Sequence, residues 1–207
     1  MSARVRGLAL AAAIAAAAGC GDVVRSSRGP AILNVDLLQG IAGGAQGTPT
    51  AVLLSDVLVL RTTPAPCSAA TPCPTIVDDF GQATLSLSMK NSTVAPTSNN
   101  QVTVSRYTVR YRRSDGRRNE SGKEPVLPYD FDGAVTATVP AGGTVAVAFE
   151  IVRHTAKEES PLVQLVSNPN VIATVADVTF YGQDLTGNAV SATGSMSVNF
   201  GNFADQR

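Results

Sequence analysis

Hydrophobic and polar residues alternate along much of the chain, and this period of two predicts β-strands rather than helices. The clearest segment is 82–90, in which Ala83, Leu85, Leu87 and Met89 fall on one face and polar residues fall on the other. One face of such a strand packs against a core while the other meets water, as in an antiparallel sheet.

Further segments carry the same alternation or a short β-branched apolar run, and these are 31–38, 52–60, 102–111, 135–139, 145–151, 171–183 and 190–200. Ser55 and Asp56 interrupt the second of them and predict a bulge. In 102–111 the apolar parity changes near Ser105 and Arg106. A change of parity predicts a bulge or bend, which is a usual place for a strand to pass from one sheet to another.

Turn residues separate the predicted strands. Segment 140–143 reads Pro-Ala-Gly-Gly and predicts a hairpin between its flanking strands, and 184–188 predicts a second one. Ser160 followed by Pro161 forms a suitable N-cap and first-turn pair. We therefore expect at most one short helical turn, near 161–166.

About eight strands with turns between them predict an all-β fold, an antiparallel two-sheet sandwich. An immunoglobulin-like or fibronectin-like Greek key is the first choice and a jelly roll is the alternative. The core Trp and inter-sheet disulfide of antibody domains are missing, because the chain contains no Trp and both cysteines outside the amino-terminal segment share one loop. We expect residues 31–207 to form a single domain.

The amino-terminal segment has the features of an export signal. Arg4 and Arg6 precede the apolar run 8–18, and Ala-Ala-Gly then leads to Cys20. This stretch resembles a bacterial lipoprotein signal, with a basic start, an apolar core and a lipobox. The resemblance covers residues 1–22 and implies a signal peptide over 1–19, lipidation of Cys20 and a tether over 20–30. A plain secretory signal is the alternative.

The same resemblance implies a location in the cell envelope. The residue after Cys20 is Gly21, so the aspartate that retains lipoproteins at the inner membrane is absent there, although Asp22 follows one position later. We expect a lipid-anchored protein that faces the periplasm or the cell surface, at the outer membrane rather than the inner one. The membrane, reached through the amino-terminal lipid, is then one partner.

Net charge argues against a nucleic-acid partner. Removing residues 1–19 removes two arginines and no acids, which leaves 14 basic and 16 acidic residues. A domain this close to neutral has no general attraction to polyanions.

Cys67 and Cys73 lie in a loop that contains four prolines. If Cys20 takes the lipid, these two cysteines remain as a pair, and an oxidising envelope favours a disulfide between them. A metal site and a pair of free buried thiols are the alternatives. No histidine or further thiol lies nearby to complete a metal site.

Signals for catalysis are weak, and we expect no enzyme and no cofactor. His154 is the only histidine, and its neighbours Arg153 and Lys157 are expected to disfavour a protonated imidazole. A serine nucleophile lacks a Gly-x-Ser-x-Gly elbow to present it. A hydrolase with paired acids is the third hypothesis for function.

Two groups of acids fall in predicted loops. Asp78 and Asp79 are adjacent, and Asp130 and Asp132 begin a partial calcium-loop pattern that lacks its later ligands. Acids that cap turns are commoner, so we expect no metal and keep only a weak calcium candidate at Asp130 and Asp132.

Arginines are concentrated in 106–118, at Arg106, Arg110, Arg112, Arg113, Arg117 and Arg118. The first three share one strand parity and are expected to line a solvent-facing stripe. Guanidinium groups bind phosphates and acidic glycans bidentately. The alternative is an ordinary charged face whose arginines meet Glu120, Glu124, Glu158 and Glu159, or an edge strand protected from aggregation.

The residues therefore predict a non-catalytic, lipid-anchored envelope protein that acts as a structural or protein-interaction module. The alternative is a binding module for an anionic glycan or another anionic ligand, through the arginine stripe 106–118. The identity of a protein partner is not encoded in any motif.

Overall fold

Strands dominate the described part of the chain, residues 29–43 and 47–203 of a computed structural model, and the all-β expectation is confirmed. The predicted signal peptide, Cys20 and the tether up to residue 28 lie outside the described residues. Ten strands and three short helical turns are present in the described ranges.

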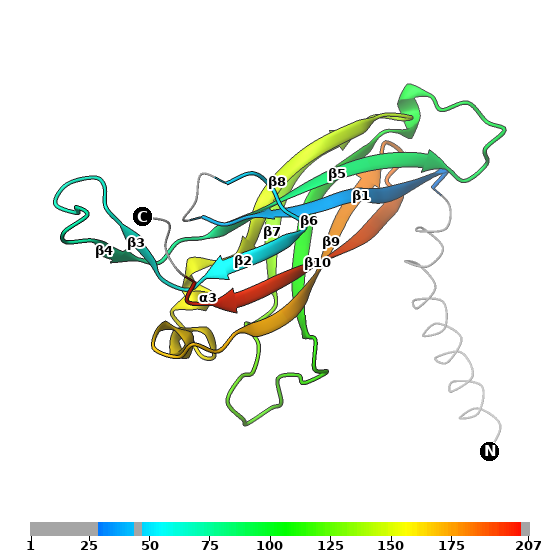
Figure 1. The fold of residues 1–207 in the computed structure, drawn as a ribbon. Helices are drawn as coiled ribbons and strands as arrows, with labels where there is room; N and C mark the ends of the chain where they lie inside the picture. The colour runs from blue at the N-terminus through cyan, green and yellow to red at the C-terminus, as the bar shows by residue number, and fades with distance from the viewer. Residues whose placement is uncertain (1–28, 44–46, 204–207) are drawn as a thin grey trace, which may run out of the picture.

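The strands form three sheets (Figure 1). A three-stranded antiparallel sheet has the order β1 (Ala31–Ile41), β5 (Asp79–Met89), β8 (Thr144–Val152). A five-stranded sheet has the order β2 (Val52–Asp56), β10 (Ala189–Gly201), β9 (Ile172–Asp184), β6 (Val102–Arg113), β7 (Phe131–Val139). The short strands β3 (Val59–Arg61) and β4 (Cys73–Thr75) pair with each other.

Segment 52–60 does not form one bulged strand, so this expectation is wrong. β2 ends at Asp56, whose carboxylate accepts a hydrogen bond from Leu58 N at 3.2 Å, and the chain then turns into β3. β2 also runs parallel to β10, so the sheets are not wholly antiparallel. The β3–β4 pair, with the proline-rich loop between its strands, connects β2 of the five-stranded sheet to β5 of the three-stranded sheet.

The predicted irregularity near Ser105 is confirmed, because the register of β6 shifts between Val104 and Arg106 against both of its neighbours. β6 nevertheless stays in one sheet, so the predicted crossing is wrong. The extra residue changes the parity instead. It keeps both Val104 and Tyr107 facing the core, with exposed fractions of 0% and 3%.

The core lies between the three-stranded and five-stranded sheets, which pack face to face. Phe149 of β8 contacts Tyr107 of β6 and Phe180 of β9, with ring centroids 5.0 and 5.3 Å apart. The predicted inward face of β5 is confirmed, since Ala83 and Leu85 are fully buried. Burial of this apolar surface drives the two sheets together.

The predicted hairpin at Pro140–Gly143 is wrong, whereas the hairpin of β9 and β10 is confirmed. β7 and β8 flank the four-residue turn but belong to different sheets. Each strand has a stronger partner elsewhere: β7 pairs with β6 and β8 pairs with β5. The turn is therefore a corner of the fold.

Helical structure is more extensive than the single turn expected. η1 (Ser98–Asn100), α3 (His154–Lys157) and η2 (Leu162–Val166) are all present. η2 occupies the predicted place, but its N-cap is Pro161 and has no capping side chain, so the role expected for Ser160 is wrong. The turn α3 was missed because its stability comes from tertiary contacts rather than from local propensity.

Gly133 of β7 leaves the space that the Tyr107 ring occupies. A Cβ atom at this position would lie 2.2 Å from Tyr107 Cζ. We predict that Gly133→Ala lowers the free energy of unfolding by about 1–3 kcal/mol, because the ring must move within a packed core. Urea denaturation measures the change. Ala134→Ser, at the exposed neighbouring position, is the control and should change stability little; equal effects of the two substitutions would contradict the packing described.

Candidate functional site

The two ends of the fold differ in what they contain. The first described residue, Gly29, lies beside the β9–β10 turn, and a Cβ atom at this glycine would lie 3.6 Å from Asn188 Cβ. The β3–β4 hairpin and α3 lie at the opposite end (Figure 1). We call this second end the α3 end. Ion pairs and hydrogen-bonded charged side chains lie there.

A buried ion pair forms the centre of the α3 end. Lys157 Nζ lies 2.9 Å from Asp79 Oδ2, and the two side chains are 0% and 1% exposed. Lys157 Nζ also donates a hydrogen bond to the carbonyl of Val77 at 2.8 Å. Ser55 Oγ and Gly43 N donate to the two oxygens of Asp79, at 2.6 and 2.9 Å. The carboxylate is thus bonded from three sides.

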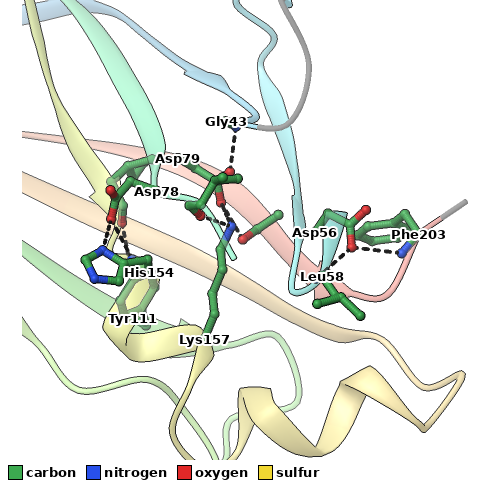
Figure 2. A network of polar contacts seen from close by, with 12 residues as sticks. Gly43, Asp56, Leu58, Asp78, Asp79, Tyr111, His154, Lys157 and Phe203 are labelled. Carbon is green, nitrogen blue, oxygen red and sulfur yellow. Dashed lines mark hydrogen bonds and ion pairs between the residues drawn. The ribbon is translucent and has the colours of Figure 1, made fainter. Parts of the chain in front are cut away.

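Four separate segments meet at this pair, as Figure 2 shows. Asp79 opens β5, Lys157 ends α3, Ser55 belongs to β2, and Gly43 follows β1. The alternation in β2 brings Ser55 inward, because Leu53 and Val57 on the same parity are fully buried. The pair therefore links both large sheets to α3.

The geometry favours a structural role for this pair over a catalytic one. Full burial excludes water and substrate from Lys157 Nζ and from the Asp79 carboxylate. Within the described ranges, no buried side-chain nitrogen or oxygen lacks a hydrogen-bond partner. A buried charge pair with complete hydrogen bonding is the arrangement that tolerates a low-dielectric environment.

Asp78 holds the other face of α3. Its Oδ1 accepts hydrogen bonds from His154 N at 2.6 Å and from His154 Nδ1 at 2.9 Å. Desolvation opposes ionisation of Asp78, but the hydrogen bonds from the His154 backbone and imidazole outweigh it and lower the carboxyl pKa. The hydrogen bond to Asp78 and its charge raise the pKa of His154 above 6.5.

The expected effect of Arg153 and Lys157 on His154 is therefore wrong. Both cations point elsewhere, since Lys157 is paired with Asp79 and Arg153 Nε lies 3.5 Å from Glu150 Oε2. Asp78 is the charged group in contact with the imidazole.

The acids singled out in the sequence do not converge on a metal site. Asp130 Oδ1 accepts a hydrogen bond from Tyr111 N at 3.3 Å, and Asp132 offers its backbone carbonyl to Arg153 at 2.7 Å. Asp78 and Asp79 point to different partners. Across residues 29–43 and 47–203, no three His, Cys, Asp or Glu side chains are placed to hold a metal ion together.

The arginine stripe lies on the outer face of the five-stranded sheet. Arg106, Arg110 and Arg112 are exposed there, as their parity predicted. The Arg106 guanidinium lies 4.3 Å from the centroid of the Tyr181 ring, and Arg110 Nε lies 3.9 Å from Asp130 Oδ2.

Two groups of arginines form closer pairs. Arg112 forms a bidentate pair with Asp177 of the adjacent strand, in which Nε donates to Oδ2 and Nη2 donates to Oδ1 at 2.8 Å. Arg113 Nη2 and Arg117 Nη2 both contact Asp115 Oδ2, at 2.9 and 2.8 Å. Hydrogen bonds from these last two guanidiniums hold the pKa of Asp115 well below its usual range.

The glutamate partners named in the alternative interpretation, Glu120, Glu124, Glu158 and Glu159, are wrong. Arg110, Arg112, Arg113 and Arg117 pair with aspartates. Glu120 instead pairs with Lys123, at 2.6 Å. Arg106, Arg112, Arg113 and Arg117 each contact an acid or an aromatic ring inside the fold. A ligand on the stripe would compete with these contacts.

Cys67 and Cys73 are bonded as a disulfide, with their Cα atoms 5.4 Å apart. The bond closes the loop between β3 and β4, and the loop residues are largely exposed. Separately, segment 113–126 and the η2 region line a cavity of about 420 Å³. Its walls include the charged Arg113 and Glu124 and the amides Asn168 and Asn170. Apolar side chains such as Leu165 and Ile172 complete the lining. The α3 end thus presents a disulfide-closed loop and a recess of mixed polarity to solvent.

Sequence reasoning missed the ion pair. Lys157 precedes Glu158 and Glu159 and looks like part of a solvated run. One signal was present: Ser55 interrupts an apolar run at a core-facing position, and a buried hydroxyl requires a partner. The identity of that partner, Asp79, depends on tertiary structure.

We predict that Lys157→Met lowers the free energy of unfolding by about 3–5 kcal/mol, because it leaves the Asp79 carboxylate buried without its counter-ion. Urea denaturation at neutral pH measures the loss. The double variant Lys157→Met/Asp79→Asn should lose much less than the sum of the two single variants. Additive losses would show that the two side chains do not interact.

We predict that the Asp78–His154 contact makes stability depend on pH. The pKa of His154 is raised in the folded state, so its contribution is complete below the unfolded value of about 6.5 and is lost as pH rises through the folded value. An NMR titration of this single imidazole gives the folded pKa directly. Asp78→Asn should lower that pKa toward its unfolded value, and an unchanged titration would contradict the contact.

None of the helices in the described residues has the length and apolar composition that crossing a bilayer requires. Comparison with known proteins adds no further constraint. No protein family, no curated protein and no solved structure matches the chain.

Proposed function

We propose that this protein is a non-catalytic, lipid-anchored protein of the bacterial envelope, and that it presents a β-sandwich to a protein partner. The lipobox-like segment that ends at Cys20 supports the anchor. Two acyl chains or more on one cysteine suffice for stable membrane attachment.

The observation that carries the proposal is the placement of the two ends of the fold. The chain enters beside the β9–β10 turn, where Gly29 lies close to Asn188. The β3–β4 loop and α3 lie at the opposite end (Figure 1), and a disulfide closes the loop. The recess is lined in part by η2, which contacts α3. An anchor on the amino-terminal side therefore leaves the loop-rich α3 end free to meet a partner.

We propose further that the sandwich is of the immunoglobulin or fibronectin kind. With the β3–β4 pair set aside, the first strand, β5 and β8 form one sheet, as strands A, B and E do in that fold. The other sheet places β6 beside β9 and β9 beside β10, as strands C, F and G. A jelly roll stays the alternative, and fold alone does not fix the function.

The ionisable side chains at the α3 end are held in contacts within the fold, and this supports a binding role rather than a catalytic one. Lys157 and Asp79 are inaccessible, and the imidazole of His154 is bonded to Asp78. Binding of an anionic glycan by the stripe 106–118 is the second candidate, and the exposure of Arg110, whose acidic contact is long, favours it.

Replacement of the lipidated cysteine tests the anchor. We predict that Cys20→Ala abolishes lipid labelling and moves the full-length protein from the membrane fraction to the soluble fraction, because no acyl chain can be attached. Metabolic labelling with a fatty acid and fractionation of native envelopes measure both effects. Cys67→Ala/Cys73→Ala is the matched control and should keep the label; membrane retention of Cys20→Ala would refute the anchor.

A further inference from the structure

The two corners where the large sheets meet are built differently. At one corner, Gly40 and Thr50 exchange backbone hydrogen bonds of 2.8 and 2.9 Å, which join β1 to the segment before β2. Gly194 of β10 also allows a close approach to Val35 of β1. At the other corner, no ladder joins β7 to β8 in the described part of the chain.

Core-facing side chains at the β7–β8 corner are incompletely covered. Val135 and Ala137 of β7 and Val145 of β8 are only half-buried. In the middle of the same core, Val104 and Val109 of β6 are 0% exposed. These three side chains are therefore partly exposed to solvent, although Val139 and Val147 on the same strands are buried.

Large side chains cover the gap between β7 and β8 only in the half of these strands nearer α3. The Arg153 guanidinium lies 4.1 Å from the centroid of the Phe131 ring and donates to the Asp132 carbonyl. Tyr107 packs beside Phe149 in the same half. In the half nearer the Pro-Ala-Gly-Gly turn, the strand residues 134–139 and 144–148 are all Val, Ala or Thr.

Charges, bulges, prolines and short length normally protect edge strands. β8 has a register shift at Ile151 and a charge at Glu150, but its exposed edge over 144–148 has none of these features. β2 has five residues, and β1 has a register shift at Val35/Leu37. β7 has a register shift against β6. β8 pairs regularly with β5 from Thr144 to Glu150 and carries no charge before Glu150.

We propose that the edge of β8 over 144–148 binds an extended, uncharged segment of a partner polypeptide, which adds a fourth strand to the three-stranded sheet. Main-chain hydrogen bonds supply affinity in this mode of binding, and alternate side chains supply specificity. Apolar β-branched side chains on one face of the added strand cover Val135, Ala137 and Val145. The neutral edge selects against charged segments.

The occupant is another polypeptide rather than a second copy, and this step rests on the proposed anchor. In a second copy, β8 would pair antiparallel with β8 of the first copy. The two copies would then point in opposite directions, and their tethers would leave at opposite ends of the dimer. β9 has 13 residues, which span about 43 Å. The nine residues 20–28 reach about 30 Å at most. Two upright copies in one membrane therefore cannot pair in this way.

Peptide binding to the full-length lipidated protein in nanodiscs tests the proposal. The probe is a fluorescein-labelled peptide of alternating Thr and Val flanked by a lysine at each end. We predict saturable binding by fluorescence anisotropy. Val145→Lys should weaken it at least tenfold, because the added strand would bury the new charge. Val190→Lys, at a half-buried core-facing position of β10, is the matched control and should bind like the parent protein.

Hydrogen exchange on the unsubstituted protein keeps the test independent of any folding defect in the variants. The peptide should slow exchange of amides in 144–148. Absence of binding, protection elsewhere, or equal losses in both variants would overturn the proposal. A peptide-free species of twice the mass with 144–148 already protected would replace the partner by a second copy. Membrane fractionation of the same protein reports on the anchor separately.

Discussion

The ion pair of Lys157 and Asp79 is the contact on which the α3 end depends. It joins β5, β2, α3 and the segment after β1 through one carboxylate. A helix of four residues has little stability of its own, so α3 exists because this pair and the Asp78–His154 contact hold it against β5. Removing one charge would leave the other buried without a partner, which couples all four segments to a single interaction.

The long strands were predictable because their signal is local, whereas the short strands β3 and β4 were not predicted as such. Alternation in β5 and in β10 appears directly in the sequence, and the change of parity near Ser105 marked a real register shift. Pairing is not local. The turn at Pro140–Gly143 has the composition of a hairpin, yet the flanking strands separate into two sheets because β6 and β5 are the partners available to them. The parallel pairing of β2 likewise follows from where its neighbours lie.

In the candidate site, too, local features were predictable from the sequence and contacts between distant residues were not. The disulfide of Cys67 and Cys73 was predictable, because these are the two cysteines outside the amino-terminal segment and they share one loop. The acids that pair with each arginine were not predictable, since an arginine side chain can reach several neighbours across a sheet. Arg112 meets Asp177 because the register places β6 and β9 side by side, and the two residues are 65 positions apart in the chain. Burial of Lys157 inverts the ordinary expectation for lysine, and only packing reveals it.

The entry of the chain beside the β9–β10 turn has an electrostatic consequence. β9 runs the length of the fold, and its 13 residues span about 43 Å. At physiological ionic strength the potential of a charged surface decays over about 8 Å. Charges at the α3 end therefore lie several decay lengths from the end of the fold where Gly29 lies. In the anchored protein that we propose, the ionic conditions at the membrane surface and the ionic contacts at the far end then vary independently of each other.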